Sequence, residues 1–287
     1  EGGLRGIPDR GDYAGLELSR WGLKSPEIEI WQGFVFVRCR PGGPSVSRIM
    51  EPFEEIIAAY RIPEMTALGR ITLRPRAVNW KTVVENYADG LHVPVAHPGL
   101  AALCGDSYRL EAGENVMHIS AEVADRGVGS WSSRAYVRIL PDVDCLPSGL
   151  RRRWNYFLLW PNLAFDLYPD QIDFMQMLPL GPDRTLIREI PYGHADDRRE
   201  MRIARYLNWR INRVVNAEAT ILITADTGPA PAVGGVCGRR RVLVRLGHRR
   251  RRPCLPFDLP VLAHTVKVGH VGRGDAGVQS ALQVDLL

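Results

Sequence analysis

The stretch from Asn79 to Pro98 constrains this chain more than any other, because it brings two histidines and one carboxylate close together in sequence. Asp89 lies three residues before His92, and His97 follows His92 by five residues. Imidazole nitrogen and carboxylate oxygen suit a borderline divalent ion such as Fe(II), and three protein ligands on one face leave the opposite face open. The pattern therefore indicates a metal that handles oxygen and substrate. The competing interpretation is chance, since a lone histidine is usually a satisfied core or surface residue.

Local signals suggest how this stretch folds. Asn79 can cap a helix that begins at Trp80 and ends near Asp89. Pro94 argues against a helical connection between His92 and His97. We therefore expect His92 at the end of the helix and His97 in the following turn. Asp89 is one helical turn before His92, close enough to accept a hydrogen bond from the ring nitrogen that faces away from a metal.

The whole string resembles the catalytic-domain signature of Rieske non-heme iron oxygenases, the large (alpha) subunits of ring-hydroxylating dioxygenases and related demethylases. The matching residues are Asn79-Trp80-Lys81, Glu85-Asn86, and Asp89, His92, His97 and Pro98. Leu91 departs from the family, which usually has Tyr there. The resemblance implies Fe(II) on the two histidines and O2-dependent hydroxylation, dihydroxylation or demethylation of a small organic substrate. It also implies that Asp89 bridges His92 to the Rieske cluster of a neighbouring subunit in a homotrimer.

The third iron ligand is the weak point of this resemblance. In the family, an aspartate within Val-x2-Glu-Asp supplies it, and the matching residues here are Val215, Glu218 and Ala219. The ligand position holds alanine. Glu218 follows Val214 by four residues and can face inward, but it is rotated by about 100° from position 219 on a helix. Glu218 is therefore an imperfect substitute ligand. We favour the alternative, in which Glu218 supports the site without binding the metal or is partly exposed, so that two histidines remain and iron binding is weak.

The fold is predicted to be α+β. Short β-type runs separated by turns indicate an antiparallel sheet at residues 115–123, 153–160, 163–168, 171–178 and 185–192. Ser45 can cap a helix that reaches Tyr60. A longer helical pattern opens at Asp196, with an inward face at Met201, Ala204, Leu207, Ile211, Val214 or Val215, and Ile221 or Leu222. A sheet curved around a long helix is the helix-grip (START/Bet v1-like) fold that the resemblance also implies, with an apolar cavity between the two.

Three domains are expected: residues 1–44, 45–224 and 225–287. Glu1-Gly2-Gly3-Leu4 resembles the end of a Rieske domain, and residues 28–37 read as a junction hairpin. No Cys-x-His or Cys-x2-His occurs, so the chain lacks the thiolate and imidazole ligands of a 2Fe-2S cluster. In the family that cluster receives electrons from an NAD(P)H-dependent reductase or ferredoxin.

The net charge of +5 is concentrated in one segment. Residues 225–287 contain ten Lys or Arg and four Asp or Glu, which leaves the preceding residues close to neutral. Little periodicity accompanies these arginines, so we interpret the segment as an atypical basic tail, translated out of frame and disordered. A nucleic-acid arm is the alternative, and it is disfavoured because aromatic residues are not interleaved with the arginines. We expect no nucleic-acid partner.

The remaining composition fits a soluble protein. Five irregularly spaced cysteines favour a reducing cytoplasm, and no apolar run of 18 residues predicts a membrane span. Two functions remain in competition for the central domain. The first is the oxygenase catalytic domain, and the second is a non-catalytic helix-grip module that binds a hydrophobic ligand. Ala219 and the missing cluster support the second, and iron content distinguishes the two.

Overall fold

A computed structural model describes residues 2–39, 41–124 and 129–225. The predictions for the basic tail beyond Ala225 fall outside these residues. The described chain divides after Arg48 into two compact units, residues 2–48 and 49–225. Each unit is described by itself. The functional candidates all belong to the second unit.

The first unit contains the predicted hairpin. Strands β1 (Glu27–Trp31) and β2 (Phe34–Arg38) pair antiparallel, after two short 3-10 turns, η1 (Arg10–Tyr13) and η2 (Leu18–Arg20). The loop residues Gln32 and Gly33 both have positive φ, 50° and 79°. This left-handed pair matches the twist of the two strands, and the glycine makes it accessible.

The prediction of one continuous helix from Ser45 to Tyr60 is wrong, because the helix is interrupted. The segment forms α1 (Val46–Met50), a 3-10 turn η3 (Glu51–Phe53) and α2 (Glu54–Ala59). Ser45 does cap the start, since its Oγ accepts a hydrogen bond from the Arg48 backbone nitrogen at 3.1 Å. Pro52 lies in the 3-10 turn, and its missing N–H interrupts the helical hydrogen bonds.

The second unit is built on an eight-stranded antiparallel sheet. Its order is β3-β10-β9-β8-β7-β6-β5, and β4 also pairs with β10. The strands are β3 (Thr66–Ala67), β4 (Thr72–Arg76), β5 (Arg109–Ala112), β6 (Val116–Glu122), β7 (Arg153–Leu159), β8 (Leu163–Leu167), β9 (Ile172–Gly181) and β10 (Arg184–Gly193).

The five predicted strands are confirmed as β6 to β10, and β3, β4 and β5 were not predicted. The missed strands are short and largely exposed, so they lack the apolar runs that identify the central strands. β4 contains Pro75, which a strand that pairs on one side can accommodate.

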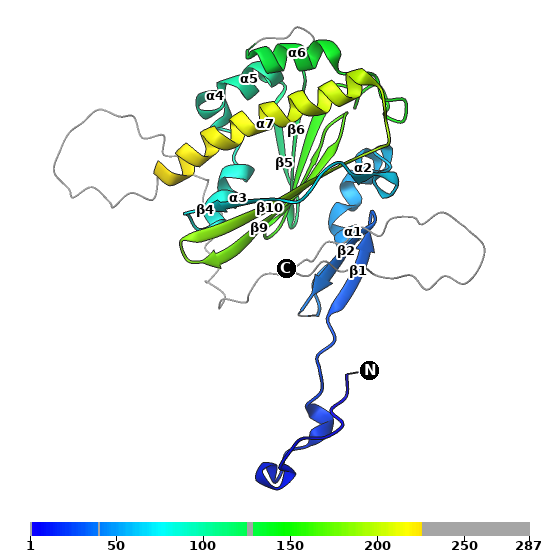
Figure 1. The fold of residues 1–287 in the computed structure, drawn as a ribbon, viewed down its shortest axis with the longest axis vertical. Coiled ribbons are helices and arrows are strands. Elements are labelled where there is room, and N and C mark those ends of the chain that lie inside the picture. Colours follow the sequence, from blue (N-terminus) through cyan, green and yellow to red (C-terminus); the bar gives the residue numbers. More distant parts are fainter. Residues whose placement is uncertain (1, 40, 125–128, 226–287) are drawn as a thin grey trace, which may run out of the picture. The chain divides into compact units, whose positions relative to one another are not determined.

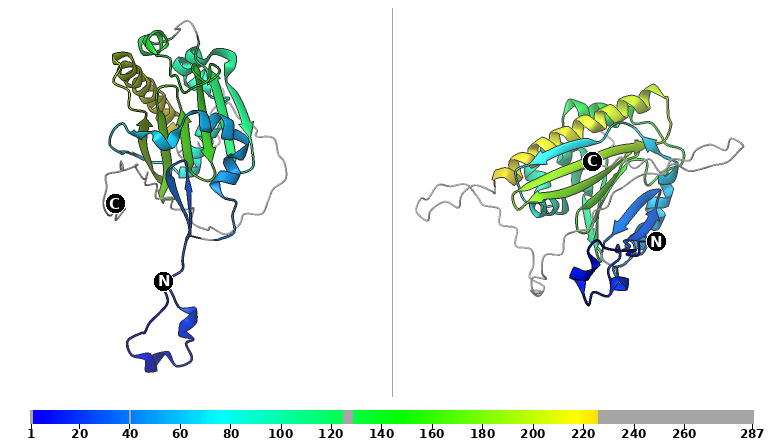
Figure 2. Two further views of the ribbon diagram at one scale, coloured as in Figure 1. Left: turned by 90° about the vertical axis from the view of Figure 1, so that its right-hand side faces the viewer. Right: turned by 60° about the horizontal axis from the view of Figure 1, so that its bottom comes forward.

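Helix α7 (Arg199–Ala225) runs across one face of this sheet (Figures 1 and 2). Besides η3 and α2, the other described helical elements of the unit are η4 (Ile62–Glu64), α3 (Trp80–Ala88), α4 (Val93–Ala96), α5 (Pro98–Cys104), η5 (Gly105–Ser107) and α6 (Trp131–Ile139). The predicted α+β arrangement of an antiparallel sheet and a long helix is therefore confirmed. Across the described residues, no helix combines the length and apolarity needed to cross a membrane.

The inward face of α7 advances in steps of four residues. Leu207 and Ile211 are buried, and the same spacing leads through Val215 and Ala219 to Ile223, which is 5% exposed. The expectation that Ile221 or Leu222 faces inward is wrong, since both are exposed. Since 3.6 residues complete one helical turn, positions 221 and 222 lie on a different side of the helix from Ala219 and Ile223. This phase places Ala219, rather than Glu218, toward the sheet.

The core between sheet and helix predicts a large effect of Trp154→Ala. Trp154 is fully buried, and its ring centroid is 4.7 Å from that of Tyr168. Its Nε1 donates to the Tyr136 hydroxyl at 3.2 Å. We expect a loss of about 3–5 kcal/mol in unfolding free energy. Trp131→Ala, at a largely exposed position, should cost less than about 1 kcal/mol. Urea denaturation measures both, and equal losses would contradict the assigned core.

Candidate metal and substrate site

The two histidines flank a short helix that the sequence did not predict. Asn79 caps α3 as expected, and its Oδ1 accepts from the Lys81 backbone nitrogen at 3.0 Å. α3 ends at Ala88, and α4 (Val93–Ala96) then connects His92 to His97. The expectation of a non-helical connection is therefore wrong. Pro94 lies in the first turn of α4, where the missing backbone N–H has no helical partner to lose.

His92 is oriented by the carboxylate that precedes it. Asp89 Oδ2 lies 3.1 Å from His92 Nδ1, and the two Asp89 oxygens also accept from the backbone nitrogens of Leu91 and His92. The contact expected from the one-turn spacing is thus present. Burial lowers the pKa of His92, with Asp89 opposing this effect. The ring is therefore neutral at pH 7, with Nδ1 donating and Nε2 carrying a lone pair.

His97 is oriented in the same way by a carboxylate distant in sequence. It is 2% exposed, and its Nδ1 lies 2.9 Å from Glu218 Oε2 on α7. The His92 and His97 ring centroids are 5.0 Å apart, with the ring planes steeply inclined. Both imidazoles therefore use Nδ1 to contact a carboxylate, and in the part of the chain that the structure describes no carboxylate contacts either Nε2. A carboxylate on the outer nitrogen is the usual way to fix a metal-binding histidine.

Position 219 lacks the carboxylate that would complete a triad. Ala219 lines the cavity beside both histidines, whereas Glu218 lies on the flank of α7 and contacts His97. Within the described ranges, no three His, Cys, Asp or Glu side chains are arranged to hold a metal. The residues present thus fit two positions of an Fe(II) site and not a complete facial triad.

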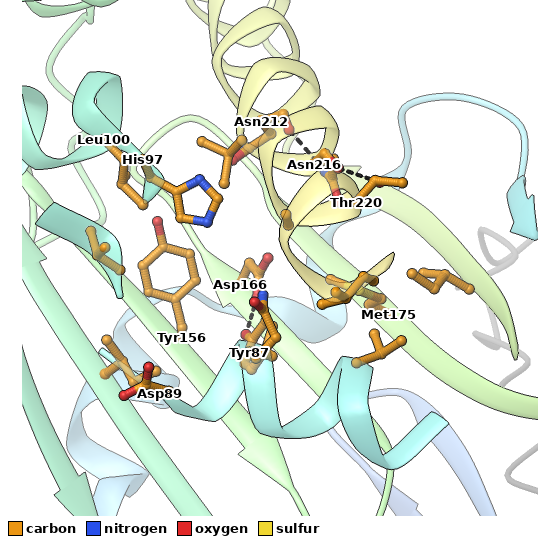
Figure 3. Close-up of a pocket in the computed structure, with 18 of the residues that line it drawn as sticks. Tyr87, Asp89, His97, Leu100, Tyr156, Asp166, Met175, Asn212, Asn216 and Thr220 are labelled. Carbon is orange, nitrogen blue, oxygen red and sulfur yellow. Dashed lines mark hydrogen bonds between the residues drawn. The ribbon is translucent and has the colours of Figure 1, made fainter. Parts of the chain in front are cut away.

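A cavity of about 130 Å³ lies between α7 and the sheet, next to the histidines. In Figure 3, His97 and Tyr156 lie on one side of this space and Asn212, Asn216 and Thr220 on the α7 side. Its lining also includes the apolar side chains of Val83, Val93, Leu100, Ile119, Met175, Met177, Ile187, Val215 and Ile223. Such a lining, which combines apolar side chains with numerous polar and charged groups, suits a small organic molecule that carries polar groups of its own.

Two buried aspartates line the cavity and were missed by the sequence reasoning. Asp166 on β8 pairs in register with Asp173 on β9. The hydroxyl groups of Tyr87 and Tyr168 donate to Asp166, and Gln171 Nε2 donates to Asp173 at 2.8 Å. Burial raises the pKa of Asp166 to about 6 and, with repulsion from Asp166, that of Asp173 to about 8. The available signal was an acidic residue within each apolar strand.

The raised pKa of Asp173 predicts a pH-dependent stability. An unfolded aspartate titrates near about 3.9, so the native state holds this proton more tightly. The resulting stability is complete below the unfolded pKa and is lost as pH rises through about 8. Asp173→Asn should therefore flatten the fall in stability between pH 5 and 9, whereas Asp106→Asn, at an exposed site, should not. Urea unfolding at several pH values measures this, and parallel pH profiles would refute it.

Comparison with known proteins identifies the family. The model of the ring-hydroxylating alpha subunit catalytic domain matches residues 62–225, more than half of the chain. The chain belongs to this family. The expectation of a Rieske-type oxygenase catalytic domain is thereby confirmed at the family level.

The relatives of this family member are oxygenase subunits. The carnitine monooxygenase oxygenase subunit of Escherichia coli K12 is 23% identical over 180 residues, which cover 61% of this chain and 44% of the relative. The glycine betaine monooxygenase oxygenase subunit of Pseudomonas aeruginosa UCBPP-PA14 is 25% identical over 87 residues, covering 30% of this chain and 20% of that protein. The chain thus spans less than half the length of these curated relatives.

Solved structures share the fold. A quaternary ammonium Rieske monooxygenase gives a TM-score of 0.55 at 19% identity, with 78% of this chain and 57% of that chain covered. Naphthalene 1,2-dioxygenase from Rhodococcus sp. bound to indole gives 0.54 at 16% identity, covering 79% and 61%. At these identities the likeness establishes the fold alone.

Proposed function

We propose that residues 45–224 form the catalytic domain of a Rieske-type mononuclear non-heme iron oxygenase, with His92 and His97 as two of the iron ligands. The supporting observation is the pair of imidazoles 5.0 Å apart at the edge of a cavity, each with Nδ1 on a carboxylate. Fe(II) held by these two imidazoles would supply O2 activation, with electrons from a 2Fe-2S cluster. That cluster and its reductase or ferredoxin lie outside this chain.

The roles of the carboxylates follow from their contacts. Asp89 holds His92 in the neutral tautomer with Nε2 available, and in the proposal it also links His92 to the electron donor of a neighbouring subunit in a homotrimer. Glu218 contacts Nδ1 of His97 as Asp89 contacts Nδ1 of His92, and so orients the His97 ring in the same way. We therefore assign Glu218 as a positioning residue and not as a substitute ligand. The position of the third iron ligand corresponds to residue 219, which is alanine in this chain.

The substrate in this proposal is a small organic molecule held beside the histidines. The relatives named for carnitine and glycine betaine support a charged compound rather than a bare hydrocarbon. A second candidate function is a non-catalytic, metal-free helix-grip module that binds a hydrophobic ligand. Ala219 favours it, because two imidazoles hold Fe(II) less well than two imidazoles and a carboxylate.

Titration of the chain with Co(II), a visible stand-in for Fe(II), tests the proposal. We expect weak binding that the double variant His92→Ala/His97→Ala removes, because the imidazoles are the ligands. A double variant with two other histidines, His118→Ala/His194→Ala, is the control and should bind as the parent does. Co(II) binding that is unchanged when His92 and His97 are replaced would contradict their assignment as metal ligands. Complete absence of binding, even after a carboxylate is added at 219, would favour the metal-free module.

A further inference from the structure

Arg76 carries a positive charge that the described protein leaves without a carboxylate partner. It is the last residue of β4 and lines the cavity that contains His97 and Ala219. Within the described residues, its side chain makes one hydrogen bond, from Nη1 to the Pro75 carbonyl at 3.0 Å. Arg74, two residues earlier on the strand, instead pairs with Glu189. The two neighbouring arginines therefore differ in whether their charge is matched.

The carboxylates that line the cavity are already engaged by other groups. Asp89 contacts His92, Asp166 accepts from Tyr87 and Tyr168, and Asp173 accepts from Gln171. The remaining one, Glu189, pairs with Arg74 as described. Among the described residues that line the cavity, an anion would thus find one unmatched positive group, the Arg76 guanidinium. Arg76 is half-buried, and the loss of water lowers its pKa. A partly desolvated guanidinium gains more from an anionic partner than one in bulk water.

Arg76 also lines a second hollow, which opens along β4, β10 and α7. Asp173, Glu189, Asn212, Asn216 and Thr220 line both hollows as well, so Arg76 lies where the two meet. The outer hollow has six arginines and two carboxylates in its lining: Arg70, Arg74, Arg76, Arg202, Arg205 and Arg213, with Asp173 and Glu189. An excess of positive charge in a concave surface raises the local concentration of anions. The outer hollow therefore favours entry of negatively charged molecules toward Arg76.

We propose that Arg76 binds the carboxylate of a carboxylate-bearing organic substrate and so orients the rest of that molecule toward His92 and His97. The inference rests on the proposed function only in treating the bound molecule as a substrate. Binding of the carboxylate to Arg76 itself requires no metal. A guanidinium suits this task because its fixed fork of N–H donors matches the two carboxylate oxygens. The apolar side chains of the cavity would then surround the uncharged part of the molecule.

The test compares matched probes that differ in charge. Butyrate, pentanoate and hexanoate are titrated into the metal-free chain by calorimetry, beside their neutral primary amides. We expect at least one acid to bind at least about tenfold more tightly than its amide. Arg76→Gln should remove that preference and leave amide binding unchanged, and Arg76→Lys should retain part of it. The control Arg184→Gln, at an exposed residue that lines neither hollow, should change acid binding by less than about threefold.

Two results would overturn the inference. One is the absence of any acid preference in the unmodified chain, a comparison that needs no variant to fold. The other is an acid preference that survives in Arg76→Gln, with folding checked by its urea midpoint. Neither result depends on Co(II). If the chain binds acids through Arg76 but binds no metal at His92 and His97, the carboxylate-binding role of Arg76 is supported and the oxygenase assignment is rejected.

Discussion

Replacing Ala219 with aspartate is expected to tighten Fe(II) binding by more than about 100-fold, since loss of groups that merely orient ligands already costs 10 to 100-fold. Ala219 lies on the inward stripe of α7 and lines the cavity beside both histidines. A carboxylate there would add the missing oxygen ligand and a negative charge. The gain is measured by anaerobic competition with a chelator, at fixed pH.

The matched control for this change is Ala217→Asp, which adds the same charge to α7 at an exposed residue. It should leave iron affinity within about threefold of the parent, because a charge exposed to solvent is screened. Tight, stoichiometric binding in the unmodified chain, abolished by Glu218→Ala and unimproved by Ala219→Asp, would instead make Glu218 the third ligand.

The central sheet and the long helix were predictable from sequence because their periodicity is determined by burial. β6 to β10 alternate with clear turn residues, and the inward positions of α7 repeat at helical spacing. The error at Ile221 and Leu222 arose because a pattern extended over many residues accumulates phase error. Elements that are short or exposed, such as β4, carry too few buried positions to produce a pattern.

The candidate site was predictable only in part. His92, His97 and Asp89 form a local motif, so spacing alone suggested the contact between Asp89 and His92. Glu218 and His97 are 121 residues apart, and their hydrogen bond depends on how α7 crosses the sheet. The same holds for Arg76, whose unmatched charge appears only when the partners of its neighbours are known. Pairings across the fold require coordinates because sequence distance contains no information about them.

The distinction between ligands and positioning residues predicts a ranking in the Ala219→Asp chain. His92→Ala or His97→Ala removes a nitrogen from the metal and should lower Fe(II) affinity by more than about 100-fold. Asp89→Asn and Glu218→Gln keep the imidazoles and weaken only the hold on Nδ1. Each should cost about 10 to 100-fold.

This ranking separates the two roles of Glu218 most sharply. If Glu218 were itself a ligand, Glu218→Gln would cost as much as loss of a histidine, and the aspartate at 219 would add little. Because Glu218 lies on His97 Nδ1, we expect its effect to resemble that of Asp89→Asn. Co(II) spectra in the same variants provide a second readout, since loss of a ligand changes the coordination geometry and hence the absorption bands. A shift of those bands in Glu218→Gln that matches the shift in His97→Ala would contradict the positioning role.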